Sequence, residues 1–283
     1  MFDIKENNTM GRDFWLYRTG QFLSIVGDYC GSIAFAWWIL DKTGSAAVMA
    51  TILAPPMLVR IFMLPLLGPI GDRFSRKHIV FISDIWRAVF TFVIVAFVMF
   101  DYFSVIPIVI IYILLSIGSA AFHSVAISIV PQLVEESKIS KAMRQSQTVM
   151  YLGMVFGGIS GGFLVSILGV RGAFAVDGIT FLISAVLALL IRAKTKPKIV
   201  VVSELSFIKQ WKKELFEGFR FIYKVPVFFW LSIFAMLCNF TFAHLNVGLP
   251  VLVKETRDLP AWFLGSLESS IGIGSIIGAL LVG

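Results

Sequence analysis

The stretch from residue 105 to residue 130 reads VIPIVIIYILLSIGSAAFHSVAISIV and contains no Asp, Glu, Lys or Arg. A helix that crosses a bilayer core of about 30 Å needs roughly 20 predominantly apolar residues, so this stretch is long enough to span. The backbone groups of a segment in lipid must be satisfied within the segment, which favours a helix over an open strand. We therefore expect a transmembrane helix here.

Seven further apolar runs flank this stretch. With it they predict eight spans, at residues 14–40, 46–70, 79–100, 105–130, 142–168, 172–191, 226–253 and 261–283. The composition agrees, because 58% of the 283 residues are hydrophobic and 14% are charged, against roughly 45–50% and about 25% in soluble domains. Both cysteines, Cys30 and Cys238, lie inside apolar runs, so a disulfide framework is not expected.

Basic residues are concentrated in alternate connections between these spans. Of the 24 Lys and Arg residues, seventeen lie in the N-terminal segment, in the second connection, in the fourth connection and the first residues after it, and in the long segment that begins at residue 192. Four lie in the other connections, and three lie deeper within spans. Because an excess of Lys and Arg marks cytoplasmic loops, we expect a multi-pass protein of the cell membrane with a cytoplasmic N-terminus. A net charge of +7 could indicate a nucleic-acid partner. The basic residues are instead distributed among the connections between apolar runs, which argues against nucleic acid.

The segment from 193 to 225 is longer and more basic than the other connections. Within residues 205–223, apolar side chains recur at helical spacing among lysines, which predicts an amphipathic helix lying in the cytoplasmic interface. We therefore expect three parts: a six-helix bundle at 1–192, a basic linker at 193–225, and two helices of a second bundle at 226–283.

The connection between the second and third expected spans reads GPIGDRFSRK at residues 68–77. It resembles the signature loop of the major facilitator superfamily, G-x-x-x-D-R-x-x-R-K. In that family the loop acts as a charge-based latch between the two halves, and a generic basic loop is the alternative. The resemblance implies a cytoplasmic gate or latch that contains Gly68, Asp72, Arg73, Arg76 and Lys77.

The fifth expected span contains the sequence GMVFGGISGG at residues 153–162. Small residues at this spacing allow two helices to approach closely. The stretch also resembles the antiporter motif of the same superfamily, G-x-x-x-G-P-x-x-G-G, with glycine where that motif has proline. The resemblance implies a functional glycine motif, whose members are Gly153, Gly157, Gly158, Gly161 and Gly162. Ordinary close packing of two helices is the alternative.

Shorter matches along the whole chain are similar to the macrolide-efflux and enterobactin-exporter branch of the superfamily. They include Gly27-Asp28, residues 84–87, residues 131–134, residues 177–181, residues 217–221 and Leu249-Pro250. Members of the family have twelve helices, and this chain stops at Gly283 directly after an apolar run. We therefore expect a sequence truncated after about eight of the twelve helices.

Ionisable residues inside a membrane span are costly and are functional candidates by default. Asp28 lies half-way along the first expected span and shares a polar face with Gln21, Ser24 and Ser32. Such a face predicts the interior of the bundle, where Asp28 is a candidate proton carrier or a structural partner of Arg18 or Arg60. Arg60 itself is a candidate either to pair with Asp28 or to contact an anionic substrate.

The remaining intramembrane polar residues are assigned by position. Asp84 and Arg87 are three residues apart and can pair on one helix face as a gate or structural ion pair. Asp177 is expected near the outer start of the sixth helix, where an acid stabilises a helix N-terminus, and is with Glu268 a further proton-coupling candidate. The other candidates to line the substrate cavity, with helix packing as the alternative, are His123, Asn239 and Asn246.

The combined interpretation is an all-α membrane protein with the major facilitator bundle. The resemblance implies proton-coupled efflux of hydrophobic or amphipathic small molecules of the drug or macrolide type, by alternating access. The expected partners are the small-molecule substrate, protons and the lipid bilayer, with the protein a monomer and without cofactor or metal. No catalytic constellation is found, so an enzyme is not expected. Export of a siderophore or lipid, or a non-transporting truncated remnant, are the alternatives.

Overall fold

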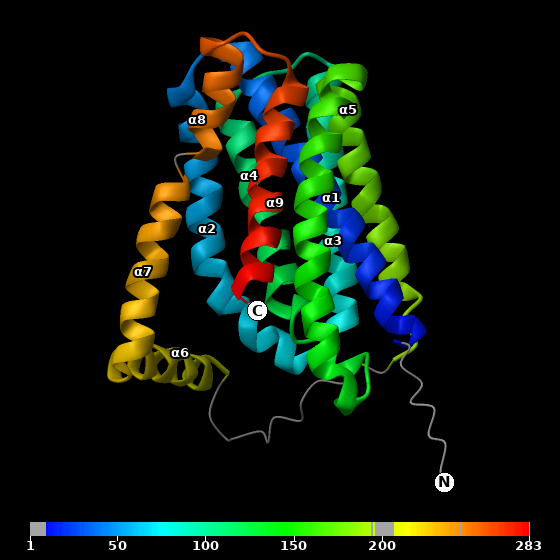
Figure 1. Ribbon diagram of the computed structural model, residues 1–283, viewed down its shortest axis with the longest axis vertical. Coiled ribbons are helices and arrows are strands. Elements are labelled where there is room, and N and C mark those ends of the chain that lie inside the picture. The colour runs from blue at the N-terminus through cyan, green and yellow to red at the C-terminus, as the bar shows by residue number, and fades with distance from the viewer. Residues whose placement is uncertain (1–9, 194, 196–206, 244, 283) are drawn as a thin grey trace.

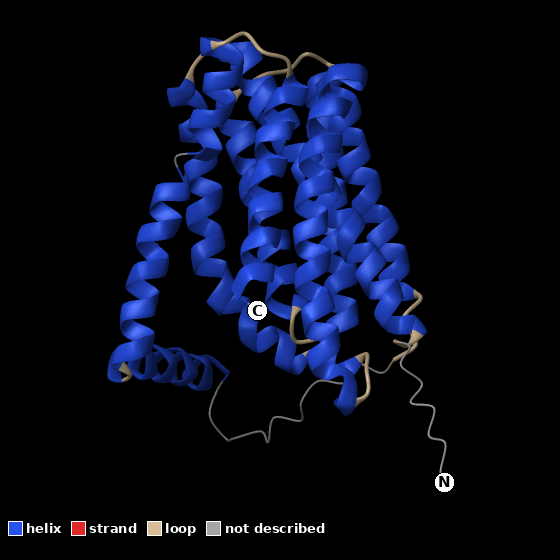
Figure 2. Ribbon diagram, in the orientation of Figure 1, coloured by secondary structure: helices blue, strands red, loops and turns tan. Residues whose placement is uncertain are grey.

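A computed structural model describes residues 10–193, 195, 207–243 and 245–282 of the chain. This part consists of helices joined by turns and loops, with no strand among the described residues (Figure 2). The helices stand roughly side by side, and one shorter helix, α6, lies across them at the end nearest the N-terminus (Figure 1). The all-helical architecture agrees with the membrane fold expected from the sequence.

The first four helices match the first four expected spans closely. They are α1 (Arg12–Thr43), α2 (Ala46–Arg73), α3 (Arg76–Met99) and α4 (Val105–Ala126). Gly44 caps the C-terminal end of helix α1. It has a left-handed φ of 56° and donates its backbone N–H to the Leu40 carbonyl oxygen at 2.8 Å. Glycine adopts this conformation without the steric cost of a Cβ atom, so the chain can turn directly into α2.

Helix α5 (Ile139–Leu189) contains both the fifth and the sixth expected spans. Its 51 residues would reach about 76 Å at 1.5 Å per residue, far more than a bilayer core needs. The chain reverses at Gly169, whose φ of 68° and ψ of 177° are not helical. The two limbs of α5 therefore run antiparallel, as Figure 1 shows.

Two short 3-10 turns, η1 (Val130–Gln132) and η2 (Glu136–Lys138), lie between α4 and α5. The elements after α5 are α6 (Phe207–Lys224), α7 (Pro226–Ala243), α8 (Leu245–Val251), the π-helical η3 (Leu252–Thr256) and α9 (Ala261–Val282). Helix α6 falls where the amphipathic linker helix is expected. The seventh expected span falls within the helical stretch Pro226–Thr256, which contains α7, α8 and η3.

Six helical stretches in the described residues are long and apolar enough to cross a membrane. They are Arg12–Thr43, Ala46–Leu64, Arg76–Met99, Val105–Ala126, Glu136–Leu189 and Pro226–Thr256. The fifth of these stretches includes the reversal at Gly169 and so holds two of the expected spans, whereas α9 is not among the six. The expected number of eight spans is therefore not confirmed.

Apolar packing joins α8, η3 and α9 to the first five helices at the end of the bundle that carries Gly44 and Gly169. Val253, Ala261 and Leu264 are buried there in one cluster with Phe35 and Trp38 of α1. A second buried cluster lies towards the opposite end and contains residues of α1, α3, α4 and α5. The polar residues of the candidate site lie between these two clusters.

Helix α5 uses two rows of glycine for two different helix contacts. A Cβ atom added to Gly157 would lie 2.7 Å from the Tyr29 side chain of α1, and one added to Gly161 would lie 2.9 Å from the Cα atom of Cys30. One added to Gly162 would lie 2.6 Å from the Ala261 carbonyl oxygen of α9. Since lipid gives helices little hydrophobic reason to associate, close backbone contact of this kind supplies the packing energy.

An ion pair ties η3 to α1 at the same end as the first apolar cluster. Lys254 Nζ lies 2.9 Å from Asp41 Oδ1 and donates a hydrogen bond to the Trp37 carbonyl oxygen at 3.0 Å. The ammonium group also sits 4.9 Å from the centre of the Trp37 ring. These contacts hold the later helices against α1 where the bundle is already packed.

We expect Lys254→Met to destabilise the protein more than Asp41→Asn. The first change removes the ion pair, the hydrogen bond and the cation–π contact, which together are worth about 1–2 kcal/mol. The second removes only a partly exposed ion pair, worth less than about 1 kcal/mol. Thermal unfolding of the detergent-solubilised variants measures both, and equal losses would contradict the assigned contacts.

Candidate functional site

Two adjoining cavities lie among helices α1 to α5. The first, which we call the aromatic cavity, has a volume of about 200 Å³, and Phe35, Tyr112, Phe174 and Phe181 are among its lining residues. The second, the polar cavity, has a volume of about 410 Å³ and includes Arg18, Gln21, His123, Ser146 and Gln147 in its lining. The cavities meet at three residues that line both, Asp28, Arg60 and Ser119.

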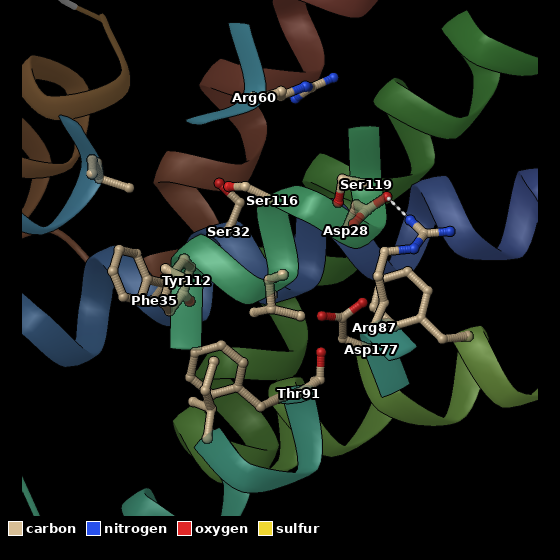
Figure 3. A pocket seen from close by; sticks show the side chains of 16 residues that line it. Asp28, Ser32, Phe35, Arg60, Arg87, Thr91, Tyr112, Ser116, Ser119 and Asp177 are labelled. Atoms are coloured by element: carbon tan, nitrogen blue, oxygen red, sulfur yellow. Dashed lines mark hydrogen bonds and ion pairs between the residues drawn. The ribbon is translucent and has the colours of Figure 1, made fainter. Parts of the chain in front are cut away.

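At this junction Asp28 forms an ion pair with Arg87 of α3. Arg87 Nη1 lies 3.3 Å from Asp28 Oδ2, as the dashed line in Figure 3 marks. The side chain of Asp28 is 46% exposed, because it faces the cavities, whereas that of Arg87 is 2% exposed. From the sequence, Arg18 or Arg60 was the expected structural partner of Asp28. That expectation is wrong, because the ion pair is with Arg87.

The same guanidinium group also binds Asp84, one turn earlier on α3. Arg87 Nη2 donates to Asp84 Oδ1 and, at 3.3 Å, to Ser24 Oγ of α1. The second oxygen of Asp84 accepts a hydrogen bond of 2.6 Å from Ser184. The Asp84–Arg87 pair expected from their spacing is therefore present, and it is part of a three-charge network.

Two aromatic rings lie close to the guanidinium group of this network. The Arg87 Cζ atom lies 4.2 Å from the centre of the Phe181 ring and 4.6 Å from that of Phe122. Asp84 itself is fully buried. A buried ion pair is stable only when its geometry and hydrogen bonds compensate the loss of hydration, so Asp84 and Arg87 depend on each other. Asp28 lines both cavities, whereas Arg87 lines the aromatic cavity only.

Asp177 is deeply buried and lines the aromatic cavity, near Arg87 in Figure 3. It lies eight residues beyond Gly169, two turns inside the second limb of α5, so the expected position at a helix N-terminus is wrong. Its carboxyl group packs against α1, where a Cβ atom added to Gly31 would lie 2.5 Å from Asp177 Oδ2. Its Oδ1 atom has no hydrogen-bond partner among the described residues.

Most of the other expected cavity residues are brought together by the fold. Gln21, Ser24 and His123 line the polar cavity, Ser32 lines the aromatic cavity, and Arg60 lines both. The polar face predicted for α1 thus runs along both cavities. The spacing within single helices carried no signal for the aromatic lining, because those rings come from three helices.

Three expected residues lie outside both cavities. Asn239 of α7 is exposed and donates its Nδ2 hydrogen bond to the Ala235 carbonyl oxygen of its own helix at 2.8 Å. Asn246 lies on α8, beyond the end of α7, and is also exposed. Glu268 lies on α9, and its Oε2 atom is buried without a hydrogen-bond partner in the described part of the chain. Their proposed roles stay predictions.

The expected latch is described in part. The side chains of Asp72 and Arg73 and the surroundings of Gly68 lie outside the described residues. Lys77 donates from Nζ to the Ile191 carbonyl oxygen at 2.8 Å, at the end of the sixth span, and Arg76 is buried. The backbone N–H of Lys77 also donates to Thr195 Oγ1 at 3.2 Å, at the start of the expected linker. The latch between halves stays a prediction.

Comparison with known proteins places this arrangement in a family. The sequence profile of the Major Facilitator Superfamily matches residues 19–283. An uncharacterized MFS-type transporter of Bacillus subtilis, YkuC, is 30% identical over 99% of this chain and 65% of its own length. Macrolide efflux protein A is 24% identical in Streptococcus pyogenes, over 99% of this chain and 68% of the relative, and 25% identical in Enterococcus faecalis, over 85% and 73%.

The chain thus spans about two thirds of the length of these relatives. The profile match confirms the resemblance carried by residues 68–77. The apolar helices agree with a multi-pass membrane protein, and the relatives are named for transport and not for an enzymatic reaction. The chain therefore belongs to the Major Facilitator Superfamily of membrane transporters.

Proposed function

We propose that the protein exports hydrophobic or amphipathic small molecules in exchange for protons. The observation that carries this proposal is the position of Asp28, which faces both cavities while it is paired to the buried Arg87. An ionisable group deep in a membrane bundle marks an ion or substrate pathway. Relatives named macrolide efflux protein A support export of an amphipathic compound.

Arg87 supplies a physical link between protonation and conformation. While Asp28 is ionised, the guanidinium group is shared between Asp28 on α1 and Asp84 on α3. Protonation of Asp28 removes the ionic attraction between α1 and α3; Asp84 is then the carboxylate that pairs with Arg87, and the hydrogen bond to Ser24 remains. A proton that binds one arrangement of the helices better than another shifts the equilibrium between them, which is the requirement for coupled alternating access.

The cavities fit this proposal in size and lining. Ligand pockets usually measure about 300–1,000 Å³ and are lined mostly by apolar and aromatic groups with a few polar ones. The polar cavity measures about 410 Å³ and joins the aromatic cavity at the proton-binding candidate. Substrate bound at this junction would be close enough to sense the charge of Asp28. Asp177 and Glu268 are the other proton-coupling candidates.

The remaining parts of the proposal follow from the charge distribution and the family. We place the protein in the cell membrane as a monomer, with a cytoplasmic N-terminus. The substrate would bind near the midplane, and rocking of one part of the bundle against another would expose it to each side in turn. The loop at residues 68–77 would then latch the cytoplasmic side.

The proposal predicts drug-dependent proton release that requires Asp28. In everted membrane vesicles with an acidic lumen, we expect amphipathic drugs to alkalinise the lumen as they enter in exchange for protons. Asp28→Asn keeps the shape of the side chain but cannot ionise, so we expect a loss of about tenfold or more in the initial rate. A pH-sensitive dye in the lumen measures this rate.

Asp101→Asn is the matched control, because it makes the same chemical change at an exposed residue in the turn between α3 and α4. We expect it to leave the rate unchanged. Full alkalinisation by the Asp28→Asn variant would move the proton carrier to another residue. If no drug alkalinises vesicles that contain the wild-type protein, exchange of drugs for protons is wrong.

A further inference from the structure

Arg18 is a buried cation without a carboxylate partner in the described structure. It is 2% exposed and lines the polar cavity. Its Nη1 and Nη2 atoms donate to the neutral side chains of Gln21 and Ser146, and its Nε atom has no hydrogen-bond partner among the described residues. The rings of Phe14 and Tyr17 lie 5.3 and 5.1 Å from its Cζ atom and provide only weak compensation.

Arg60 is the second cation of the polar cavity. It projects from α2 and stands apart from the Asp28–Arg87 pair in Figure 3. Its side chain is exposed to the cavities and has no hydrogen bond or ion pair with any described residue. Arg60 therefore brings a positive charge without a direct ion-pair contact in the described structure to the junction of the two cavities.

The acidic residue in the lining of the polar cavity does not balance its two arginines, and Asp177 lines the aromatic cavity instead. Asp28 is the acidic residue that lines the polar cavity, and it is already paired with Arg87. Asp84 is also bound to Arg87 and is fully buried. The polar cavity thus presents the guanidinium donors of Arg18 and Arg60, and such donors bind carboxylate and phosphate groups through charge-assisted, often bidentate, hydrogen bonds.

We propose that the transported molecule is an amphipathic organic anion, whose acidic group binds Arg18 and Arg60 while its apolar part enters the aromatic cavity. This inference rests on the proposed function and names the chemical class of its substrate. Arg60 lines both cavities, so a molecule held there by its acidic end lies beside the rings of Phe35, Phe174 and Phe181.

Arg18 and the proton carrier lie at different places along α1, whereas Arg60 shares the junction of the cavities with Asp28. Arg18 lies ten residues before Asp28, which corresponds to about 15 Å of helix. An anion bound near Arg18 therefore does not have to displace the Asp28–Arg87 ion pair. Arg18 can therefore be altered by mutation without removing a partner of Asp28.

Fluorescein and rhodamine 6G provide a matched test, because they share a xanthene ring system and differ in charge. Fluorescence anisotropy of each dye with the detergent-purified protein measures binding without a proton gradient. We expect fluorescein to bind about tenfold or more tightly than rhodamine 6G. Arg60→Gln should weaken fluorescein binding about tenfold, the fold-change expected from a lost charge-assisted hydrogen bond, and leave rhodamine binding unchanged.

Arg144→Gln is the control, because it removes an exposed arginine of α5 that lines neither cavity; it should leave both affinities unchanged. Arg18→Gln should act like Arg60→Gln. If it fails to fold, Arg18→Lys keeps the charge but loses the forked donors and should weaken fluorescein binding to a smaller extent. Equal binding of the two dyes, no saturable fluorescein binding, or fluorescein binding unaffected by Arg60→Gln would each overturn the proposal.

The acidic group could belong to a soluble molecule or to a lipid. Nanodiscs of phosphatidylcholine, with and without added phosphatidylglycerol, distinguish these sources. Loss of fluorescein binding upon addition of phosphatidylglycerol identifies a lipid headgroup as the anion, and unchanged binding identifies a soluble one. Drug-dependent proton release with cationic drugs alone, together with no fluorescein binding, would overturn this inference and leave the proposed exchange of drugs for protons intact.

Discussion

Replacing Arg87 by methionine is expected to remove most of the folded protein. The change leaves the carboxyl group of Asp84, which is fully buried, without its cation. Breaking a buried ion pair by removing one partner costs about 3–5 kcal/mol, a large part of the roughly 5–15 kcal/mol by which proteins are stable. The yield of monodisperse protein after detergent extraction, and its unfolding temperature, measure the loss.

A double variant separates the buried charge from the shape of the site. Asp84→Asn together with Arg87→Met removes both charges, and replacement of a whole buried ion pair is often neutral or stabilising. Asp28 keeps access to water through the cavities. We therefore expect the double variant to regain stability relative to Arg87→Met. A double variant that is less stable than Arg87→Met would refute the interdependence of Asp84 and Arg87.

Replacing Gly265 by valine is expected to detach α9 from α5. A Cβ atom at Gly265 would lie 2.2 Å from the Gly158 carbonyl oxygen and 3.1 Å from the Gly162 Cα atom. These atoms belong to the backbone, so the contact can be relieved only if the helices separate. Overpacking costs about 1–3 kcal/mol and occasionally more, and separation also breaks the hydrogen bond of 2.8 Å from Ser269 Oγ to the Val155 carbonyl oxygen.

Gly274→Val is the matched control on the same helix, because a Cβ atom added to Gly274 has no neighbour within 4 Å. Both variants exchange a helical glycine for the same residue, so propensity effects cancel in the comparison. Cysteine pairs across α5 and α9, or the unfolding temperature in detergent, report the contact. If the two variants lose equal stability, close packing at Gly265 is not what holds α9.

The positions of the helices could be predicted because span length and polarity are local properties. Apolar runs at 14–40, 46–70, 79–100 and 105–130 correspond to α1 to α4, since any such run in lipid must form its own hydrogen bonds. The break near Gly169 also falls between two predicted runs. The seventh run, at 226–253, falls within the helical stretch Pro226–Thr256, which contains α7, α8 and η3.

Periodicity predicted the faces of helices but not the neighbours of those faces. The rows of Gly153, Gly157 and Gly161 and of Gly158 and Gly162 were visible from their spacing. That the first row packs against α1 and the second against α9 depends on how three helices are arranged, and no local pattern encodes that arrangement. The same holds for Asp177, which the local pattern placed at a helix end and the fold places in the buried interior.

The amino-acid sequence was sufficient to establish a membrane protein of this superfamily and a polar face on α1 with Asp28 at its centre. It also predicted the Asp84–Arg87 pair, because both residues lie on one helix and their separation is set by helical geometry. The pairing of Asp28 with Arg87 required the folded bundle. Those residues are 59 positions apart, and their contact depends on the packing of both α1 and α3 against α5.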